Sequence, residues 1–261
     1  MAIRAVVWGE NIHDRENAVV RGIYPKGMHG AIAEALNEDA GIKASTATME
    51  QPEHGLPEAR LAETDVLTWW GHRNHAGVDD KIVERVAERV WQGMGLIVLH
   101  SGHFSKIFKK LMGSPCSLKW REAGEKERVW VINRNHPIAA GLEPYFVIPQ
   151  TEMYGEPFLV PEPMETLFIS WYDGGEVFRS GLTFQRGAGR IFYFSPGHEV
   201  YPIYQDKNVR QILRNAAKWA YNPAPAWKDV STAANTPIDR APEPISEKGP
   251  KLHAVGEAGF R

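Results

Sequence analysis

The stretch GLIVLHSGHFSKIF, residues 95–108, decides the fold, because an apolar run stops abruptly at His100-Ser101-Gly102-His103 and helical spacing resumes after it. A short, uninterrupted apolar run is typical of a strand that is buried on both faces of a sheet. A sharp corner between strand and helix aims one side chain and the amides that follow it into a cleft. The sequence therefore predicts a buried strand that ends in a histidine-rich elbow.

Other segments of the first half repeat this alternation of strand and helix. Strand-like runs lie at residues 3–8, 42–48 and 65–70, and amphipathic helices begin at Met28 and Asp79. In the second helix apolar residues recur every fourth position from Ile82, and charged residues lie largely opposite. This spacing predicts βαβ units, and so an α/β fold with a parallel sheet covered by helices on both faces.

The second half of the chain has a different pattern. Strand-like runs at 128–132, 145–148, 166–171, 176–184 and 189–195 are separated by turns rich in proline and glycine, and a last helix begins at Lys207. We expect an antiparallel extension of the sheet, after which the chain returns to the main sheet at 189–195. Residues 1–221 would then form one α/β domain.

Residues 222–261 are predicted to be a proline-rich C-terminal tail or arm. Repeated prolines and small polar residues exclude a long helix or strand there. One interpretation is a disordered tail. The other is an extended arm on this or a neighbouring protomer, and we expect a homodimer or larger assembly because four apolar residues could anchor such an arm: Trp227, Ile238, Ile245 and Phe260.

The composition excludes several classes of protein. The 261 residues carry a formal charge of −2, with no stripe of Lys and Arg to follow a phosphate backbone, so we expect no nucleic-acid partner. No apolar run reaches the roughly 18 residues of a membrane span. The N-terminus lacks the pattern of a signal peptide, and the single cysteine, Cys116, can form no internal disulfide, so a cytoplasmic location is expected.

Seven of the ten histidines follow predicted strands or open the first helix, and should therefore meet at one edge of the sheet. In an open parallel sheet ligands bind at the carboxyl ends of the strands. One histidine alone is weak evidence, and the HxxH spacing at 72/75 and 100/103 is a weak metal signal on loops. The set is stronger evidence: His13, His29, His72, His75, His100, His103 and His198.

Two kinds of chemistry would use such a cluster. One is a divalent metal bound by imidazoles and a carboxylate, and the other is acid/base catalysis on a polar substrate. Glu152 is the first choice for the carboxylate, in an expected loop that also holds Tyr154, and Glu199 follows His198 directly. Asn11 adds a hydrogen-bonding group suited to sugar hydroxyls. The tryptophans at strand ends, Trp8, Trp69 and Trp70, could stack on a sugar, although core packing is their commoner use.

Five motifs together carry a family resemblance. They are VVWGENIHD (6–14), YPKGMHGAIAEAL (24–36), VLHSGHFSKIF (98–108), TEMYGEPF (151–158) and FYFSPGHE (192–199). Residues 3–221 resemble the trehalose-utilisation ThuA-like family. The resemblance implies a flavodoxin-like, three-layer sheet of the class I glutamine-amidotransferase type. It also implies a role in catabolism of trehalose and related disaccharides, alongside a partner oxidoreductase that forms 3-keto sugars.

The elbow differs from that of a true amidotransferase, where the strand ends in a cysteine nucleophile. Here His100 stands at that position, and Cys116 lies too far along the chain to serve it. His198 and Glu199 match the end of the amidotransferase triad, and a loop with His72 and His75 replaces the glycine-rich oxyanion loop. Ser101, one place beyond the corner, would point elsewhere. Cysteine-based amide hydrolysis is therefore not expected.

We expect an enzyme that acts on a disaccharide or its 3-keto derivative, assisted by a metal, Zn²⁺ or Mn²⁺. The alternatives are a non-catalytic sugar-binding or accessory subunit of a keto-sugar oxidoreductase system, and a structural dimer module. For the enzyme, the expected catalytic residues are His100, Glu152 and His198, and the expected metal ligands are His103, Glu152 and His198. The expected substrate-binding residues are Asn11, His13, His72, His75, Tyr154 and Glu199.

Overall fold

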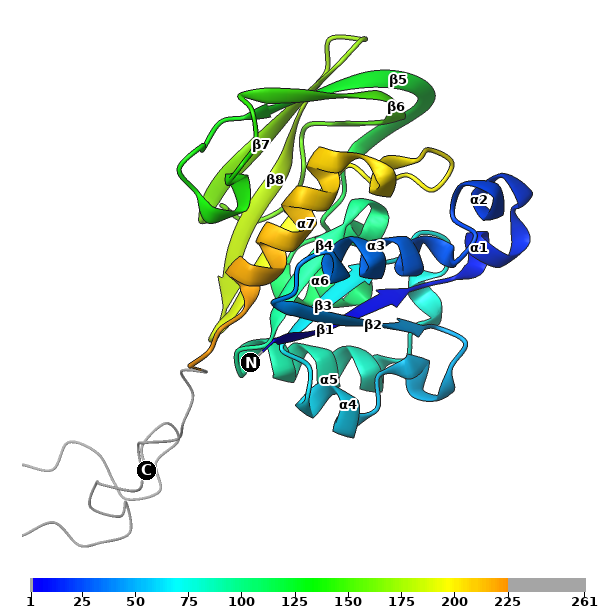
Figure 1. The fold of residues 1–261 in the computed structure, drawn as a ribbon, viewed down its shortest axis with the longest axis vertical. Coiled ribbons are helices and arrows are strands. Elements are labelled where there is room, and N and C mark those ends of the chain that lie inside the picture. The colour runs from blue at the N-terminus through cyan, green and yellow to red at the C-terminus, as the bar shows by residue number, and fades with distance from the viewer. Residues whose placement is uncertain (1, 225–261) are drawn as a thin grey trace, which may run out of the picture. The chain divides into compact units, whose positions relative to one another are not determined.

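The structure, a computed structural model, describes residues 2–224, in which nine strands form one sheet in the order β2-β1-β3-β4-β9-β8-β7-β5-β6 (Figure 1). Five of them pair in parallel: β1 (Ile3–Gly9), β2 (Ile42–Thr48), β3 (Val66–Trp70), β4 (Gly95–Leu99) and β9 (Gly189–Phe194). β3 and β4 are buried along their whole length, as their continuous apolar runs predict. The parallel core is confirmed.

The antiparallel extension is also confirmed. β5 (Lys119–Val131), β6 (Tyr145–Gly155), β7 (Glu165–Tyr172) and β8 (Val177–Arg186) pair only in antiparallel fashion, and β8 joins them to β9. They form the upper part of the molecule in Figure 1. The predicted tail lies, from residue 225 onward, outside the described residues.

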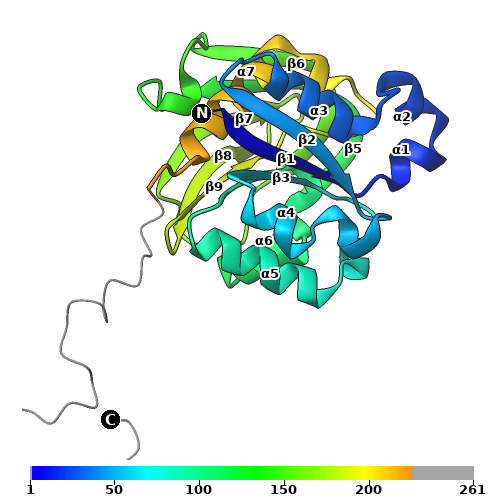
Figure 2. The same cartoon turned by 60° about the horizontal axis from the view of Figure 1, so that its bottom comes forward.

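Helices cover both faces of the parallel strands (Figure 2). α3 (Gly27–Asn37) and α7 (Lys207–Ala220) lie on one face, and α4 (Glu58–Ala62), α5 (Asp80–Trp91) and α6 (Lys106–Met112) lie on the other. Two short helices, α1 (Ile12–Glu16) and α2 (Ala18–Ile23), follow β1. Each face has its own apolar core, which makes three layers. None of the helices described has the length and apolar character needed to cross a membrane.

β6 continues further than the sequence suggested. Glu152 and Tyr154 were expected in a loop between strand-like segments, but both lie within β6. The strand continues because β5 starts early enough to pair with it, with Trp120 opposite Tyr154. The expected loop position is therefore wrong, and the two side chains sit on a rigid strand.

Trp8 and Trp69 belong to the core. Their rings stack with centroids 3.9 Å apart, and each is 1% exposed. Of the two uses considered for these residues, packing is the one that the structure shows.

Glu127, on β5, is a buried carboxyl group within the antiparallel extension. The hydroxyls of Ser170 (2.5 Å) and Tyr172 (3.2 Å) donate to Oε1, and Oε2 has no partner among the described residues. Burial raises the pKa of Glu127 to about 7, although the two hydroxyls favour the ionised form. The folded chain therefore holds this proton at pH values where the unfolded chain has released it.

This difference predicts that the contribution of Glu127 to stability is full at about pH 4 and is lost as the pH rises to about 7. Glu127→Gln, which cannot ionise, should remove that loss and unfold with roughly 1–3 kcal/mol more free energy than wild type near pH 8. Urea unfolding at about pH 5 and pH 8 measures the difference. Glu88→Gln, on the exposed face of α5, is the control. If the free energy of unfolding has the same pH dependence in wild type and Glu127→Gln, the raised pKa of Glu127 is contradicted.

Candidate functional site

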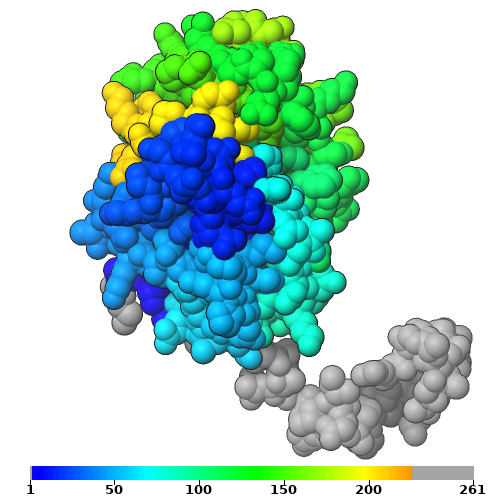
Figure 3. Space-filling model, turned by 90° about the vertical axis from the view of Figure 1, so that its right-hand side faces the viewer, coloured from blue at the N-terminus to red at the C-terminus, as the bar shows by residue number. Residues whose placement is uncertain are grey.

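Histidines from four parts of the chain gather where the parallel strands end. His13 lies in α1 after β1, His72 follows β3, His100 follows β4, and His198 follows β9. Neighbouring ring centroids among these four lie 5.1 to 6.4 Å apart. In the space-filling view blue, cyan, green and yellow segments meet on one face of the molecule (Figure 3). The convergence expected from the sequence is present.

The elbow after β4 has the strained backbone of a tight corner. His100 has φ +48°, a left-handed conformation that is uncommon for residues with a side chain. A short 3-10 turn (His100–Phe104) follows, and the Ser105 hydroxyl then caps α6 by accepting from the amide of Phe108. The loop after β9 packs against this corner at Gly197, where a Cβ atom would come within 2.9 Å of the His100 Cβ. A close approach of two strand ends therefore builds the elbow.

The hydrogen bonds of His100 fix the role of each ring nitrogen. Nδ1 lies 2.8 Å from the carbonyl oxygen of Ser195, so it carries the proton and donates it. With a single ring proton on Nδ1, the lone pair of Nε2 faces the cleft. Tyr154 stacks on the ring with centroids 4.7 Å apart, and its hydroxyl lies 3.3 Å from Nε2.

His100, Glu152 and His198 form a buried group, called here the central group. Their potential ligand atoms all lie within 4.8 Å of one another. Nε2 of His100 is 3.1 Å from Oε2 of Glu152, yet this oxygen has no hydrogen-bond partner among the described residues, because the contact lies off the direction of a hydrogen bond. Burial alone would raise the pKa of Glu152, but the nearby imidazoles outweigh it and hold the pKa below its usual value. The group is thus a buried carboxylate held between two imidazoles.

His103 lies outside the central group, although the sequence suggested it as a metal ligand with Glu152 and His198. Its Nδ1 donates to the carbonyl of Cys116 over 2.6 Å, and its ring lies edge-on to that of Tyr154, with centroids 5.5 Å apart. The imidazole that meets both other residues is that of His100, at the elbow itself. The buried group that could hold a metal therefore contains His100 in place of His103, together with Glu152 and His198.

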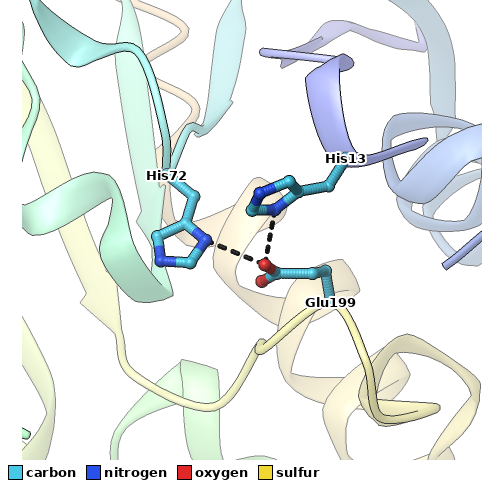
Figure 4. Close-up of side chains that lie close together, drawn as sticks. All are labelled: His13, His72 and Glu199. Carbon is cyan, nitrogen blue, oxygen red and sulfur yellow. Dashed lines mark hydrogen bonds and ion pairs between the residues drawn. The ribbon is translucent and has the colours of Figure 1, made fainter. Parts of the chain in front are cut away.

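His13, His72 and Glu199 form a second group, called here the outer group (Figure 4). Nδ1 of His13 and Nδ1 of His72 lie 2.5 Å and 2.8 Å from the same oxygen, Oε1 of Glu199. Burial opposes ionisation of Glu199, but the two imidazoles outweigh it and hold its pKa far below the usual range. Burial would lower the pKa of His72, and its hydrogen bond to Glu199 raises it above the usual value instead.

A buried carboxylate fixes the loop that carries His72. Glu10, directly after β1, accepts hydrogen bonds from the backbone amides of His72 (2.7 Å), Arg73 (3.0 Å) and Asn74 (3.0 Å). Three backbone donors on one carboxylate hold a loop strongly, because each bond is charge-assisted. Glu10 thus positions the outer group without belonging to it.

A cavity of about 450 Å³ opens beside the central group. Trp120, on β5, is 65% exposed and lies on its wall. Burial lowers the pKa of His75 to about 4 and that of His103 to about 3, so both rings are neutral at neutral pH. The cavity is lined by His72, His75, Ser101, His103, Phe104, Ser117, Leu118, Trp120, Glu122, Glu152 and Tyr154. Aromatic faces beside polar groups suit a sugar.

The remaining predicted residues have varied positions. His72, His75 and Tyr154 line the cavity, but Asn11 donates to Glu50 and lies in neither group. The hydroxyl of Ser101 donates to the carbonyl of Gly71 over 2.8 Å, so its proton does not go to a histidine base.

Glu10 and Trp120 are among the residues of the site that sequence reasoning missed. Glu10 stands within the quoted WGEN motif, directly after a strand, and that position was a usable signal. The sequence around Trp120 gave no such signal, because only the pairing of β5 with β6 brings Trp120 to the cavity.

Comparisons with known proteins agree with this architecture. The profile of the ThuA family, described as trehalose utilisation, matches residues 4–220. No curated protein sequence matches this chain. A ThuA-like protein from Parabacteroides merdae superposes with a TM-score of 0.63 at 16% identity, over 84% of this chain and 90% of that one.

Two further solved structures share the fold. A ThuA-like protein from Bacteroides uniformis has a TM-score of 0.60 at 16% identity, over 84% of this chain and 91% of that one. A GMP synthase protein from Thermoplasma acidophilum has a TM-score of 0.51 at 14% identity, over 84% and 94%. The glutamine-amidotransferase-like fold is thus confirmed. Because the family profile spans nearly all of the described residues, the chain belongs to the ThuA trehalose-utilisation family.

Proposed function

We propose that this chain is a metal-assisted enzyme that acts on a disaccharide, such as trehalose, or on its 3-keto derivative. The observation that carries the proposal is the 3.1 Å approach of His100 Nε2 to Glu152 Oε2 in a buried group. Both atoms are acceptors when Nδ1 of His100 holds the ring proton. In this tautomer two buried lone pairs face each other, and a bound cation would offset their repulsion.

The donor set supports Zn²⁺ or Mn²⁺ as that cation. Two imidazoles and one carboxylate, beside a cavity that leaves a coordination position open, are typical of catalytic metal sites. Such an ion acts as a Lewis acid on a carbonyl or lowers the pKa of a water molecule. The Ser195 carbonyl orients His100 by accepting from its other nitrogen, as second partners of metal-binding histidines commonly do.

The cavity supports a sugar as the substrate. The neutral rings of His75 and His103 can exchange hydrogen bonds with hydroxyl groups, and Nδ1 of His103 is already committed to Cys116. Trp120 offers an exposed ring face on the wall of the cavity. A ketone sugar needs an electrophile at its oxygen and a proton-transfer group nearby, and the central group provides a carboxylate for that transfer.

We expect Glu152→Gln to lower the affinity for Zn²⁺ by about 100-fold or more, because it removes the anionic ligand of the central group. Zinc content after dialysis, together with product formation from trehalose and 3-keto-trehalose, measures the effect. His136→Ala changes a remote histidine whose Nε2 lies 3.6 Å from Glu165, and serves as the control. Chelated wild type that still turns over either sugar would contradict metal assistance. Sugar binding without turnover in the metal-loaded protein would favour the alternative of a non-catalytic accessory role.

Trp120→Ala should raise KM for the sugar about tenfold, because it removes a stacking face, and should leave the metal content unchanged. Trp120→Phe should restore most of the loss. Steady-state kinetics and metal analysis separate the two effects. The matched control is Trp171→Ala, an exposed tryptophan on β7 that does not line the cavity. Equal KM values for wild type and Trp120→Ala would show that Trp120 does not contact the sugar.

A further inference from the structure

We infer that the outer group is a second divalent-cation site, so that the cleft holds two neighbouring metal positions. The inference rests on the proposed metal at the central group and extends it to a two-metal centre. It assigns His13, His72 and Glu199 as ligands, where the sequence had suggested contacts to substrate.

The geometry of the outer group is that of ligands around a common point. Nδ1 of His13 and Nδ1 of His72 both approach Oε1 of Glu199, and the ligand atoms lie within 4.8 Å of one another. Only the His72 contact lies along a hydrogen bond. The His13 contact is 2.5 Å, so two imidazole nitrogens from different parts of the chain converge on one carboxylate oxygen. Two imidazoles with one carboxylate are a common ligand set for divalent transition metals.

Glu199 lacks any other compensation for its charge. It is 3% exposed, and its second oxygen, Oε2, has no hydrogen-bond partner within residues 2–224. Across the same part of the chain its ion-pair contacts are to histidines, with no Lys or Arg among them. A buried carboxylate oxygen without a partner is costly. A bound cation would offset that cost.

The two groups are adjacent and differently exposed. Oε2 of Glu199 lies 3.8 Å from Nδ1 of His198, a member of the central group, and the ring centroids of His72 and His100 are 6.4 Å apart. The side chains of His13 and His72 are 21% and 33% exposed, whereas those of the central group are at most 6% exposed. Ions and water can therefore reach the outer group from solvent.

Two neighbouring metals would specify the kind of ligand. Paired ions bind the two oxygens of one substrate at the same time, as in other two-metal sites. Adjacent oxygens of a sugar, either two vicinal hydroxyls or a carbonyl beside a hydroxyl, match that requirement. The class of ligand inferred is therefore a chelating vicinal diol or hydroxyketone.

The test is the stoichiometry of Zn²⁺ binding by the whole, chelator-treated chain, measured by equilibrium dialysis with elemental analysis. Wild type should bind two ions per chain. His13→Ala and Glu152→Gln should each bind one, and the double variant none. Glu199→Gln, which keeps the shape of the side chain, should also lose the outer ion. His136→Ala is the control for adventitious binding to histidine, and circular dichroism confirms that each variant is folded.

The outcomes separate this inference from the proposed function. If wild type binds one ion, which His13→Ala keeps and Glu152→Gln loses, the outer site is overturned and the central metal site is supported. If wild type binds one ion, which His13→Ala loses and Glu152→Gln keeps, the outer site is supported and the metal at the central group is contradicted. No bound ion in wild type would overturn both, and the outer group would then be a hydrogen-bonded His-Glu-His set.

Discussion

The hydrogen bond from Nδ1 of His100 to the carbonyl of Ser195 is the constraint on which the site depends. It joins the end of β4 to the end of β9, two neighbouring parallel strands. In the singly protonated ring the bond places the proton on Nδ1, and Nε2 faces Glu152. The left-handed backbone at His100 is compatible with this arrangement because Gly197 lets the second strand end approach closely. Without that contact the ring could turn either nitrogen to the cleft.

The site is shared between the two parts of the sheet. The parallel strands supply the histidines at their carboxyl ends, as in other open α/β sheets. The antiparallel strands supply Glu152 and Tyr154 from β6 and Trp120 from β5. The parallel core, with its glutamine-amidotransferase-like fold, thus meets a carboxylate and an aromatic wall that come from the antiparallel extension. At the elbow an imidazole, that of His100, lies beside this carboxylate.

Much of this arrangement could be predicted from the sequence, because local patterns carry it. The buried run GLIVL and the amphipathic helix from Asp79 have periods that fix strand and helix without help from the rest of the chain. The position of each histidine after a strand then follows from the sheet. What could not be predicted depends on pairing between distant segments. His103 seemed equivalent to His100 along the chain, but its bond to Cys116 turns it away, and Trp120 meets the cavity only because β5 pairs with β6.

The carboxylate of Glu10 has a consequence for how this cleft can vary. It holds the loop at residues 72–74 through three backbone amides, so these three bonds do not depend on which side chains the loop carries. Side chains at these positions can be exchanged while the backbone stays in place. The loop is therefore a natural position for specificity to diverge between relatives, and a scaffold on which new recognition groups can be placed without rebuilding the fold.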